Sequence, residues 1–202
     1  MKPYIVAMTG ASGSVYGIRL VRALAELGHE VALIISEPAR LVLREETGFS
    51  LRSFNRPEDL TAIFGAENMD RIQSYSPRDF TAPIASGSFP TAGMMIVPCS
   101  MGTLAAVATG ISQNLIQRAA DCTIKEARKL VLVPRETPLS AIHLENMLKL
   151  ARLGAGIVPA MPGFYSGVQT LEGMVDFVVG KVLDQFGIMH ALYPRWTGTL
   201  QK

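Results

Sequence analysis

The stretch Thr9-Gly10-Ala11-Ser12-Gly13-Ser14-Val15-Tyr16-Gly17 decides the fold of this 202-residue chain. It follows a short apolar run, Ile5–Met8, and precedes apolar residues that recur at helical spacing: Ile18, Val21, Leu24 and Leu27. The pattern predicts a buried strand, a glycine turn and a helix. Such a turn directs free backbone N–H groups and the positive end of a helix dipole at one point, which favours the binding of an anion such as a phosphate.

The glycine spacing in this stretch is G-x-x-G-x-x-x-G, which is neither the dinucleotide fingerprint G-x-G-x-x-G nor the P-loop. Gly10 and Gly13 permit a positive φ and a close approach of the backbone, and Ser12 adds a hydroxyl donor. We expect the turn to bind phosphate. The alternative is a tight strand-to-helix turn that holds no ligand.

The composition excludes several classes of protein. The net charge is +2 with no basic run and no acidic tail, so nothing points to nucleic acid or to an anionic membrane. Hydrophobic residues make up 49% and charged residues 18%, which predicts that part of the surface is buried between subunits. The two cysteines form no disulfide framework, and no stretch reaches the ~20 apolar residues of a membrane helix. We expect a cytoplasmic, reduced protein.

Apolar runs of strand length alternate with helical patterns along the chain. We expect strands at 5–8, 31–36, 93–97, 130–133 and 157–158, with helices between them and a weak pattern from 50 to 90. The alternation predicts one doubly wound α/β domain over 1–202, of Rossmann or flavodoxin type. Its sheet is mostly parallel with helices on both faces, and a C-terminal tail begins at about 188.

Ligands of such sheets bind beyond the carboxyl ends of the strands. At those ends the chain places glycine, hydroxyl, charged or aromatic residues: Gly10–Gly13, Ser36, Ser100–Thr103, Arg135 with Glu136, and Phe164 with Tyr165. A purely structural sheet would not require these residue types. We therefore expect a binding site at this edge.

Six segments, taken together, resemble one known family. They are Thr9–Gly13, Ala85–Ser88, Pro98–Leu104, Arg118–Asp121, Val133–Pro138 and Pro162–Tyr165. In order and over nearly the whole chain, they are similar to the flavin prenyltransferases of the ubiquinone pathway, long described as phenolic-acid decarboxylases. The resemblance implies binding of FMN and dimethylallyl phosphate, and attachment of the prenyl group to reduced flavin between N5 and C6. It also implies transfer of prenylated FMN to a separate decarboxylase, and a closed homo-dodecamer with sites at subunit contacts.

The resemblance also assigns roles to individual residues. The positions that resemble the FMN-binding residues are Gly10, Ala11, Ser12, Ser36, Ser100, Met101, Gly102, Thr103 and Arg135. Ser12 resembles a hydroxyl near the flavin N5 that relays a proton. Glu46 matches a carboxylate implicated in ring closure as the base for the C6 proton. The alternative for Glu46 is an exposed acid at a helix end, and Glu45 competes for the same role.

The prenyl phosphate requires cations, because the leaving oxygens must be held while a carbocation forms in a dry pocket. The candidate cations are Arg118, Lys125, Arg135 and Lys181, three of which lie in segments that match the family. The resemblance implies that Tyr165 and Lys181 hold the prenyl phosphate and that Glu136 is a phosphate-site carboxylate. The alternatives are a solvated helix face for Arg118 and Lys125, an ordinary surface ion pair for Glu136, a loop aromatic for Tyr165 and a solvated lysine for Lys181. No D-D-x-x-D segment is present, which fits a monophosphate donor held without metal.

The remaining candidates are single residues. Phe80 stands where some relatives have tryptophan, a departure that concerns the shape of the pocket. Cys99 has no neighbouring base, and we expect it to be a buried packing residue. The histidines His29, His143 and His190 are isolated, so no metal site is expected. Trp196 resembles an aromatic at the mouth of the site; the alternative is an oligomer contact.

Three other functions compete with prenyl transfer. An FMN-dependent aromatic-acid or cysteine-type decarboxylase shares the fold, but the cysteine type requires Pro-x-Met-Asn where this chain has Pro159-Ala160-Met161-Pro162. An NAD(P)-dependent reductase requires a Tyr-x-x-x-Lys pair, and here Tyr165 is followed four residues later by Gln169. A non-catalytic FMN carrier would use the same cofactor motifs.

Overall fold

A six-stranded parallel sheet with the strand order β3-β2-β1-β4-β5-β6 forms the centre of the protein. This is a computed structural model, and it describes residues 2–164, 170–196 and 198. The strands are β1 Tyr4–Met8, β2 Val31–Ile35, β3 Ile72–Tyr75, β4 Gly93–Cys99, β5 Leu130–Pro134 and β6 Gly156–Ile157. The order reverses between β1 and β4, which is the point where doubly wound sheets bind ligands.

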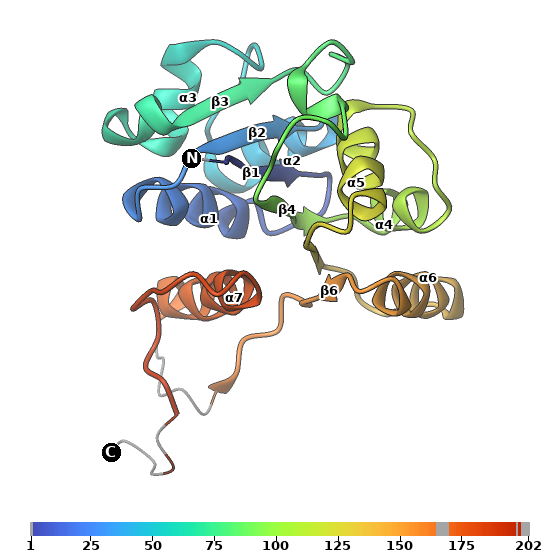
Figure 1. Cartoon of the computed structure of the whole chain (residues 1–202). Helices are drawn as coiled ribbons and strands as arrows, with labels where there is room; N and C mark the ends of the chain where they lie inside the picture. Colours follow the sequence, from blue (N-terminus) through green and yellow to red (C-terminus); the bar gives the residue numbers. More distant parts are fainter. Residues whose placement is uncertain (1, 165–169, 197, 199–202) are drawn as a thin grey trace.

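Helices cover both faces of the sheet (Figure 1). One face carries α1 Ser14–Glu26, α2 Glu37–Thr47, α3 Pro57–Phe64 and α7 Leu171–Gln185, and the other carries α4 Met101–Ala108, α5 Leu115–Lys125 and α6 Ala141–Arg152. Two short 3₁₀ segments, η1 Ala66–Arg71 and η2 Pro83–Ala85, flank β3. The predicted single doubly wound domain with a parallel sheet is confirmed.

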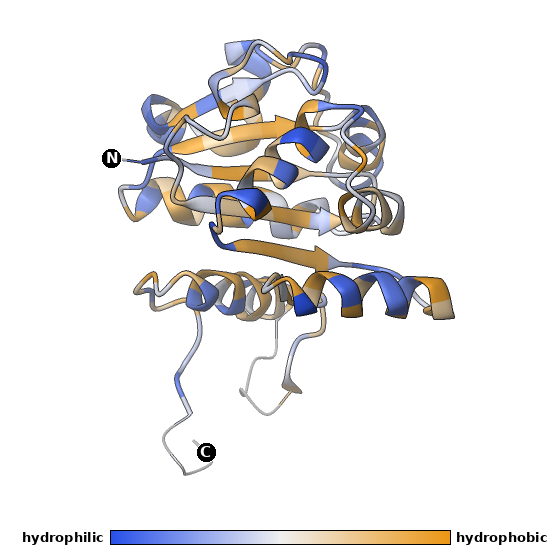
Figure 2. Ribbon diagram, turned by 45° about the vertical axis from the view of Figure 1, so that its right-hand side comes forward, coloured by the Kyte–Doolittle hydropathy of each residue, from blue (hydrophilic) through white to orange (hydrophobic). Residues whose placement is uncertain are grey.

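The two hydrophobic cores follow from the alternation of side chains along each strand. Val6 and Met8 face the core under α1 and α7, whereas Ile5 and Ala7 face the core under α4 and α5. Because both faces are covered, β1, β2, β4 and β5 are apolar along nearly their whole length, and the strands at the centre of the sheet are orange in Figure 2. This burial explains why β1, β2, β4 and β5 could be predicted from apolar runs alone.

Local capping sets the helix boundaries. The side chains of Ser36, Ser100, Asn114, Ser140 and Thr170 each accept a backbone N–H of the first helical turn of α2, α4, α5, α6 and α7, respectively. At the other end of α2, Gly48 adopts φ 75°, as expected of a residue that ends a helix. The helices lie between the strands, as the alternating pattern predicts.

The edge strand β3 is the element that the sequence pattern did not predict. It is short, and its side chains Gln73 and Ser74 interrupt the apolar run. Its pairing with β2, with Val31 opposite Ile72 and Ile34 opposite Tyr75, defines it as a strand. Within the part of the chain that the structure describes, none of the helices is both long and apolar enough to cross a bilayer.

Candidate active site at the carboxyl edge of the sheet

A buried threonine joins the two strands at the reversal point of the sheet. The hydroxyl of Thr9 donates to the carbonyl of Pro98 at 2.9 Å and accepts the N–H of Ser100 at 2.7 Å. On the other side of β1, the N–H of Ser36 donates to the carbonyl of Met8 at 2.9 Å. The ends of β2, β1 and β4 are therefore held at one edge. Thr9 is not among the predicted site residues, although a hydroxyl directly after a buried strand is a signal that could have identified it.

The glycines of the first turn serve close packing as well as conformation. A Cβ at position 10 would lie 2.5 Å from the Cβ of Pro38, and a Cβ at position 17 would lie 2.5 Å from the carbonyl oxygen of Val97. Gly13 adopts φ 108°, in the left-handed region that disfavours other residues. The spacing of these glycines therefore follows from the contacts of the turn with α2 and β4.

The carboxylate of Glu46 occupies the N-terminus of α1. Its oxygens accept the N–H of Gly13 at 2.9 and 3.1 Å and the N–H of Ser14 at 2.8 Å. Burial raises the pKa of Glu46, but the hydrogen bonds from the Ser12 hydroxyl and from these N–H groups outweigh it and lower that pKa. The expectation that the free N–H groups of this turn bind a phosphate is therefore wrong for these two donors, because the protein's own carboxylate takes them.

This contact brings together two predicted catalytic residues, Ser12 and Glu46, which are distant in sequence. The same contact shows which of the two neighbouring acids of α2 reaches the glycine turn. Glu45 pairs with Arg44 at 2.9 Å on the exposed side of the helix, whereas Glu46 turns toward the glycine loop. Glu46 is thus more than an exposed acid at a helix end.

The predicted cofactor residues lie on neighbouring strand ends along the same edge. The hydroxyl of Ser100 accepts the N–H of Thr103 at 3.3 Å and donates to its Oγ1 at 3.1 Å. Gly102 is exposed and faces open space, since a Cβ there would meet nothing within 4 Å. Ser36 similarly caps α2 by accepting the N–H of Ala39 at 3.2 Å. Met101, by contrast, is 8% exposed and packs into the core under α4.

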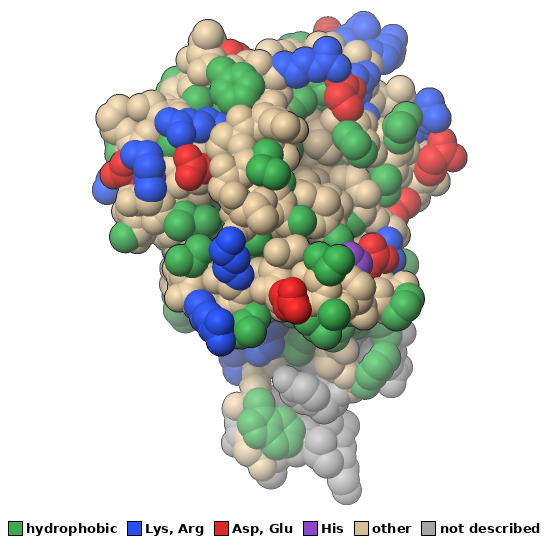
Figure 3. Space-filling model, turned by 90° about the vertical axis from the view of Figure 1, so that its right-hand side faces the viewer, with side chains coloured by type: hydrophobic (Ala, Val, Ile, Leu, Met, Phe, Trp, Pro, Cys, Tyr) green, Lys and Arg blue, Asp and Glu red, His purple; other side chains and the backbone are tan. Residues whose placement is uncertain are grey.

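The end of β5 extends this edge with a cation and an acid. Arg135 is exposed directly after the strand, and half-buried Glu136 accepts the N–H of Thr137 at 3.1 Å. The contacts of the described residues include no ion pair between Arg135 and Glu136, so the structure does not support the alternative of an ordinary surface pair. Figure 3 views the side of the molecule toward which the strands of Figure 1 run; backbone and small polar side chains take up its centre.

Of the two predicted cations of α5, Arg118 holds a serine-rich loop, and Lys125 lies close to the same loop. Arg118 donates from Nε to the carbonyl of Ala85 at 3.0 Å and pairs with Asp121 at 2.9 Å. Lys125 pairs with Glu126, and its Nζ would lie 2.5 Å from a Cβ added to Gly87. The solvated-face alternative is therefore wrong for Arg118.

A third cation that binds this loop, Arg128, was not predicted from the sequence. It donates to the carbonyl of Gly87 at 2.7 Å and to the carbonyl of Phe89 at 2.8 Å. No local pattern signals it, because its partners, two backbone carbonyls and the hydroxyl of Thr91, lie 37 to 41 residues earlier. Arg118 and Arg128 together fix the course of the loop at Ala85–Phe89.

Lys181 lies on α7, apart from both groups. Its Nζ lies 5.0 Å from the ring centroid of Tyr193 and 5.4 Å from that of Phe177. Tyr165, the predicted partner of Lys181 at the prenyl phosphate, lies outside the described residues. Among the hydrogen bonds and ion pairs of the described residues, none joins Lys181 or the α5 cations to Ser12 or Glu46.

The other single candidates fall in varied surroundings. Cys99 is fully buried, and burial raises the pKa of its thiol far above the usual range, so the prediction of a packing residue is confirmed. Phe80 is 49% exposed and Trp196 60% exposed. In the ranges 2–164, 170–196 and 198, no group of histidine, cysteine and acidic side chains is arranged to hold a metal ion.

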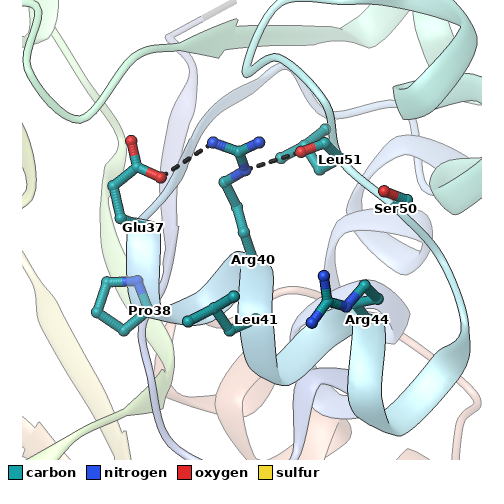
Figure 4. Close-up of a pocket in the computed structure, with 7 residues that line it drawn as sticks. All are labelled: Glu37, Pro38, Arg40, Leu41, Arg44, Ser50 and Leu51. Carbon is teal, nitrogen blue, oxygen red and sulfur yellow. Dashed lines mark hydrogen bonds and ion pairs between the residues drawn. The ribbon is translucent and has the colours of Figure 1, made fainter.

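An open hollow of about 420 Å³ lies beside α2, behind the glycine turn (Figure 4). Arg40 spans it, with Nη1 2.9 Å from Glu37 and Nε donating to the carbonyl of Leu51 at 2.8 Å. Pro38, which packs on Gly10, forms part of its wall. None of the predicted cofactor or substrate residues lines this hollow, so the candidate site is the strand edge.

Comparison with known proteins supports one family. A family model described as Flavoprotein matches residues 1–183. The flavin prenyltransferase UbiX of Halalkalibacterium halodurans is 51% identical over 96% of this chain and 92% of its own length.

Two solved structures are similar over nearly the whole chain. The crystal structure of AnUbiX (PadA1) in complex with FMN and dimethylallyl pyrophosphate superimposes with a TM-score of 0.87 at 41% identity, covering 98% of both chains. The dodecameric FMN-dependent UbiX-like decarboxylase of Escherichia coli O157:H7 gives a TM-score of 0.86 at 46% identity, covering 98% of this chain and 100% of that one. This chain therefore belongs to the flavoprotein family and, within it, to the flavin prenyltransferases.

Proposed function

We propose that this protein transfers the dimethylallyl group of dimethylallyl phosphate to N5 and C6 of reduced FMN, and that a separate decarboxylase receives the prenylated FMN. One observation carries the proposal: Ser12 and Glu46 meet at the reversal point of the sheet, in a chain that is 41% identical to a protein crystallised with FMN and dimethylallyl pyrophosphate.

The strand edge has donors that suit FMN. Ser36 and Ser100 supply hydroxyl groups, Gly102 leaves open space at the start of α4, and Arg135 supplies an exposed cation for a phosphate. Bound there, reduced FMN would supply an electron-rich ring as the prenyl acceptor. The protein's contribution is to orient this ring, to exclude water from it and to move protons beside it.

Ser12 and Glu46 are suited to move one proton. The Glu46 carboxylate is ionised at neutral pH and therefore has oxygens free to accept a proton; its lowered pKa makes it a weaker base than an ordinary carboxylate. The Ser12 hydroxyl already donates to this carboxylate and can pass on a proton received at its oxygen. We assign Ser12 to the relay at N5 and Glu46 to the removal of the C6 proton.

The leaving phosphate requires cations and hydrogen-bond donors. We assign Arg118, Lys125 and Lys181 as the cations, Tyr165 as a hydroxyl donor and Glu136 as the phosphate-site carboxylate. Within one chain the described members of this set lie on α5, after β5 and on α7. We therefore infer that neighbouring copies complete each site in a closed homo-oligomer, a dodecamer like that of the Escherichia coli relative. The 49% hydrophobic composition is compatible with such burial.

The test is an anaerobic incubation of the purified protein with reduced FMN and dimethylallyl phosphate, followed by mass spectrometry of the flavin. We expect a flavin heavier by one prenyl group. Bound FMN without this adduct would instead identify a flavin carrier.

The Escherichia coli relative is described as a decarboxylase, so decarboxylation is the second candidate. The same preparation should release no CO₂ from aromatic acids or from peptides with a C-terminal cysteine when dimethylallyl phosphate is omitted. Release under these conditions would favour the decarboxylase.

A further inference from the structure

One carboxylate, Asp184, fastens the segment after α7 to that helix. Arg195 lies 2.7 Å from its Oδ1 and donates to its Oδ2 at 2.8 Å. The hydroxyl of Tyr193 also donates to Oδ2, and His190 donates from Nε2 to Oδ1 at 3.1 Å. Burial raises the pKa of Asp184, but the hydrogen bonds from Arg195, Tyr193 and His190 lower it to about 2.

The negative charge of Asp184 would destabilise α7 if the helix stood alone. It lies in the last turn of α7, where the carbonyl ends of the helix disfavour a negative charge. The neighbouring segment supplies the compensation, because all the donors that surround this carboxylate come from residues 190–195. The carboxylate thus serves the attachment of the segment and not the helix.

His190 completes the attachment in one defined tautomer. Its side chain is 1% exposed, and its Nδ1 accepts the N–H of Leu192 at 3.2 Å, so the proton is on Nε2. The Nε2–H group of His190 points at Asp184 and at the carbonyl of Gly180, whose oxygen lies 3.0 Å from Nε2. The imidazole therefore joins the helix backbone to the carboxylate.

Gly180 provides the surface on which this segment rests. A Cβ at position 180 would lie 2.5 Å from the ring of Tyr193 and 2.7 Å from Cε1 of His190. Glycine within a helix is unfavourable relative to alanine, so this position needs a compensating contact. The close approach of the two rings to α7 is that contact.

Lys181 is the functional residue nearest to this attachment. Its ammonium lies over the rings of Tyr193 and Phe177, and the described residues offer it no ion pair with a carboxylate. The Tyr193 ring is 8% exposed and is held by Asp184 through its hydroxyl. The place of the ammonium therefore depends on a ring that belongs to the attached segment.

We propose that Asp184 is a positioning residue for the prenyl phosphate: by fastening residues 188–195 to α7, it fixes the Tyr193 ring against which Lys181 is held. This inference rests on the proposed function, in which Lys181 binds that phosphate. It predicts that loss of the carboxylate weakens the use of dimethylallyl phosphate while leaving the residues assigned to FMN intact.

The test compares Asp184→Asn with Asp176→Asn, a matched change on the same helix. The side chains of Asp176 and Asp184 are 26% and 24% exposed, and Asp176 pairs with Arg19 of α1 at 2.6 Å, away from the C-terminal segment. We expect Asp184→Asn to raise the KM for dimethylallyl phosphate about tenfold, the effect of losing one well-placed charge contact, with the Kd for FMN unchanged. Asp176→Asn should leave both constants at their wild-type values.

A purely structural role would alter stability without separating the two constants. The thermal midpoint of each variant is measured alongside, and Tyr193→Leu, which keeps Asp184 and its other partners, replaces Asp184→Asn if the latter does not fold. An unchanged KM for dimethylallyl phosphate in the folded variant, or an equal rise in Asp176→Asn, would overturn the inference. If the wild-type protein forms no prenylated flavin, the proposed function itself fails, which is a separate result.

Discussion

Replacement of Glu46 by glutamine tests the assignment of this residue to the N-terminus of α1. The carboxylate accepts the N–H groups of Gly13 and Ser14 at 2.8 to 3.1 Å. Glutamine keeps one acceptor oxygen but loses the charge, and its amide group would face an N–H donor. Because the role proposed for Ser12 depends on the same contact, we expect this substitution to change stability and activity together.

The magnitude follows from the contacts that are lost. A carboxylate at a helix N-terminus contributes about 0.3–1 kcal/mol at an exposed position. A hydrogen bond to a charged group contributes about 1 kcal/mol more than a neutral one. Glu46 is exposed, so we take the low end for both. We expect the free energy of unfolding to fall by about 1.3 kcal/mol at pH 7, and the thermal midpoint to fall by about 3–5 °C for a chain of this size.

The stabilisation by Glu46 depends on pH, because it requires the ionised carboxylate. Because the folded protein lowers the pKa of Glu46 below the usual value of 4.5, the stabilisation is fully present above that value. It is lost as the pH falls through the lower, folded pKa. The difference between wild type and Glu46→Gln should therefore be largest near neutral pH and should shrink in acid.

The assay is thermal and urea unfolding at a fixed protein concentration, at pH 7 and at pH 3.5. Glu45→Gln is the matched control, because this exposed neighbour pairs with Arg44 alone among the residues that the structure describes, and its loss should cost less than about 0.5 kcal/mol. If both variants lose the same stability, or if the Glu46→Gln difference is equal at the two pH values, Glu46 does not cap α1 as described.

Two further substitutions test the packing that forms the site. Thr9→Val removes the acceptor of the Ser100 N–H and should lower the free energy of unfolding, measured by urea titration, by about 1–3 kcal/mol. The control is Thr109→Val, at an exposed helix end, which should lower it far less. Gly17→Ala places a Cβ 2.5 Å from the carbonyl oxygen of Val97 and should lower the free energy of unfolding by about 1–3 kcal/mol. Gly102→Ala is its control, because a Cβ there faces open space and should not lower the urea midpoint. Equal midpoints within either pair would contradict the packing described.

Local patterns in the sequence were sufficient for most secondary structure. A Ser, Asn or Thr cap acts on backbone groups two or three residues away, and a buried strand requires its own apolar residues. Both signals are therefore contained in short windows, as the observed caps Ser36, Ser100 and Thr170 illustrate. The strand β3 has no such signal, because it is an edge strand defined by its pairing with β2.

Short stretches of sequence predict only part of the candidate site. The sequence by itself placed glycine, hydroxyl and charged residues at the strand ends, because parallel strands end at one edge. Only the tertiary structure decided that Glu46, rather than Glu45, reaches the glycine turn and takes the N–H groups expected for a phosphate. It also decided that Asp184 gathers His190, Tyr193 and Arg195 beside Lys181. These contacts depend on how the sheet and its helices pack, and no local propensity encodes which side chains that packing brings within hydrogen-bonding distance.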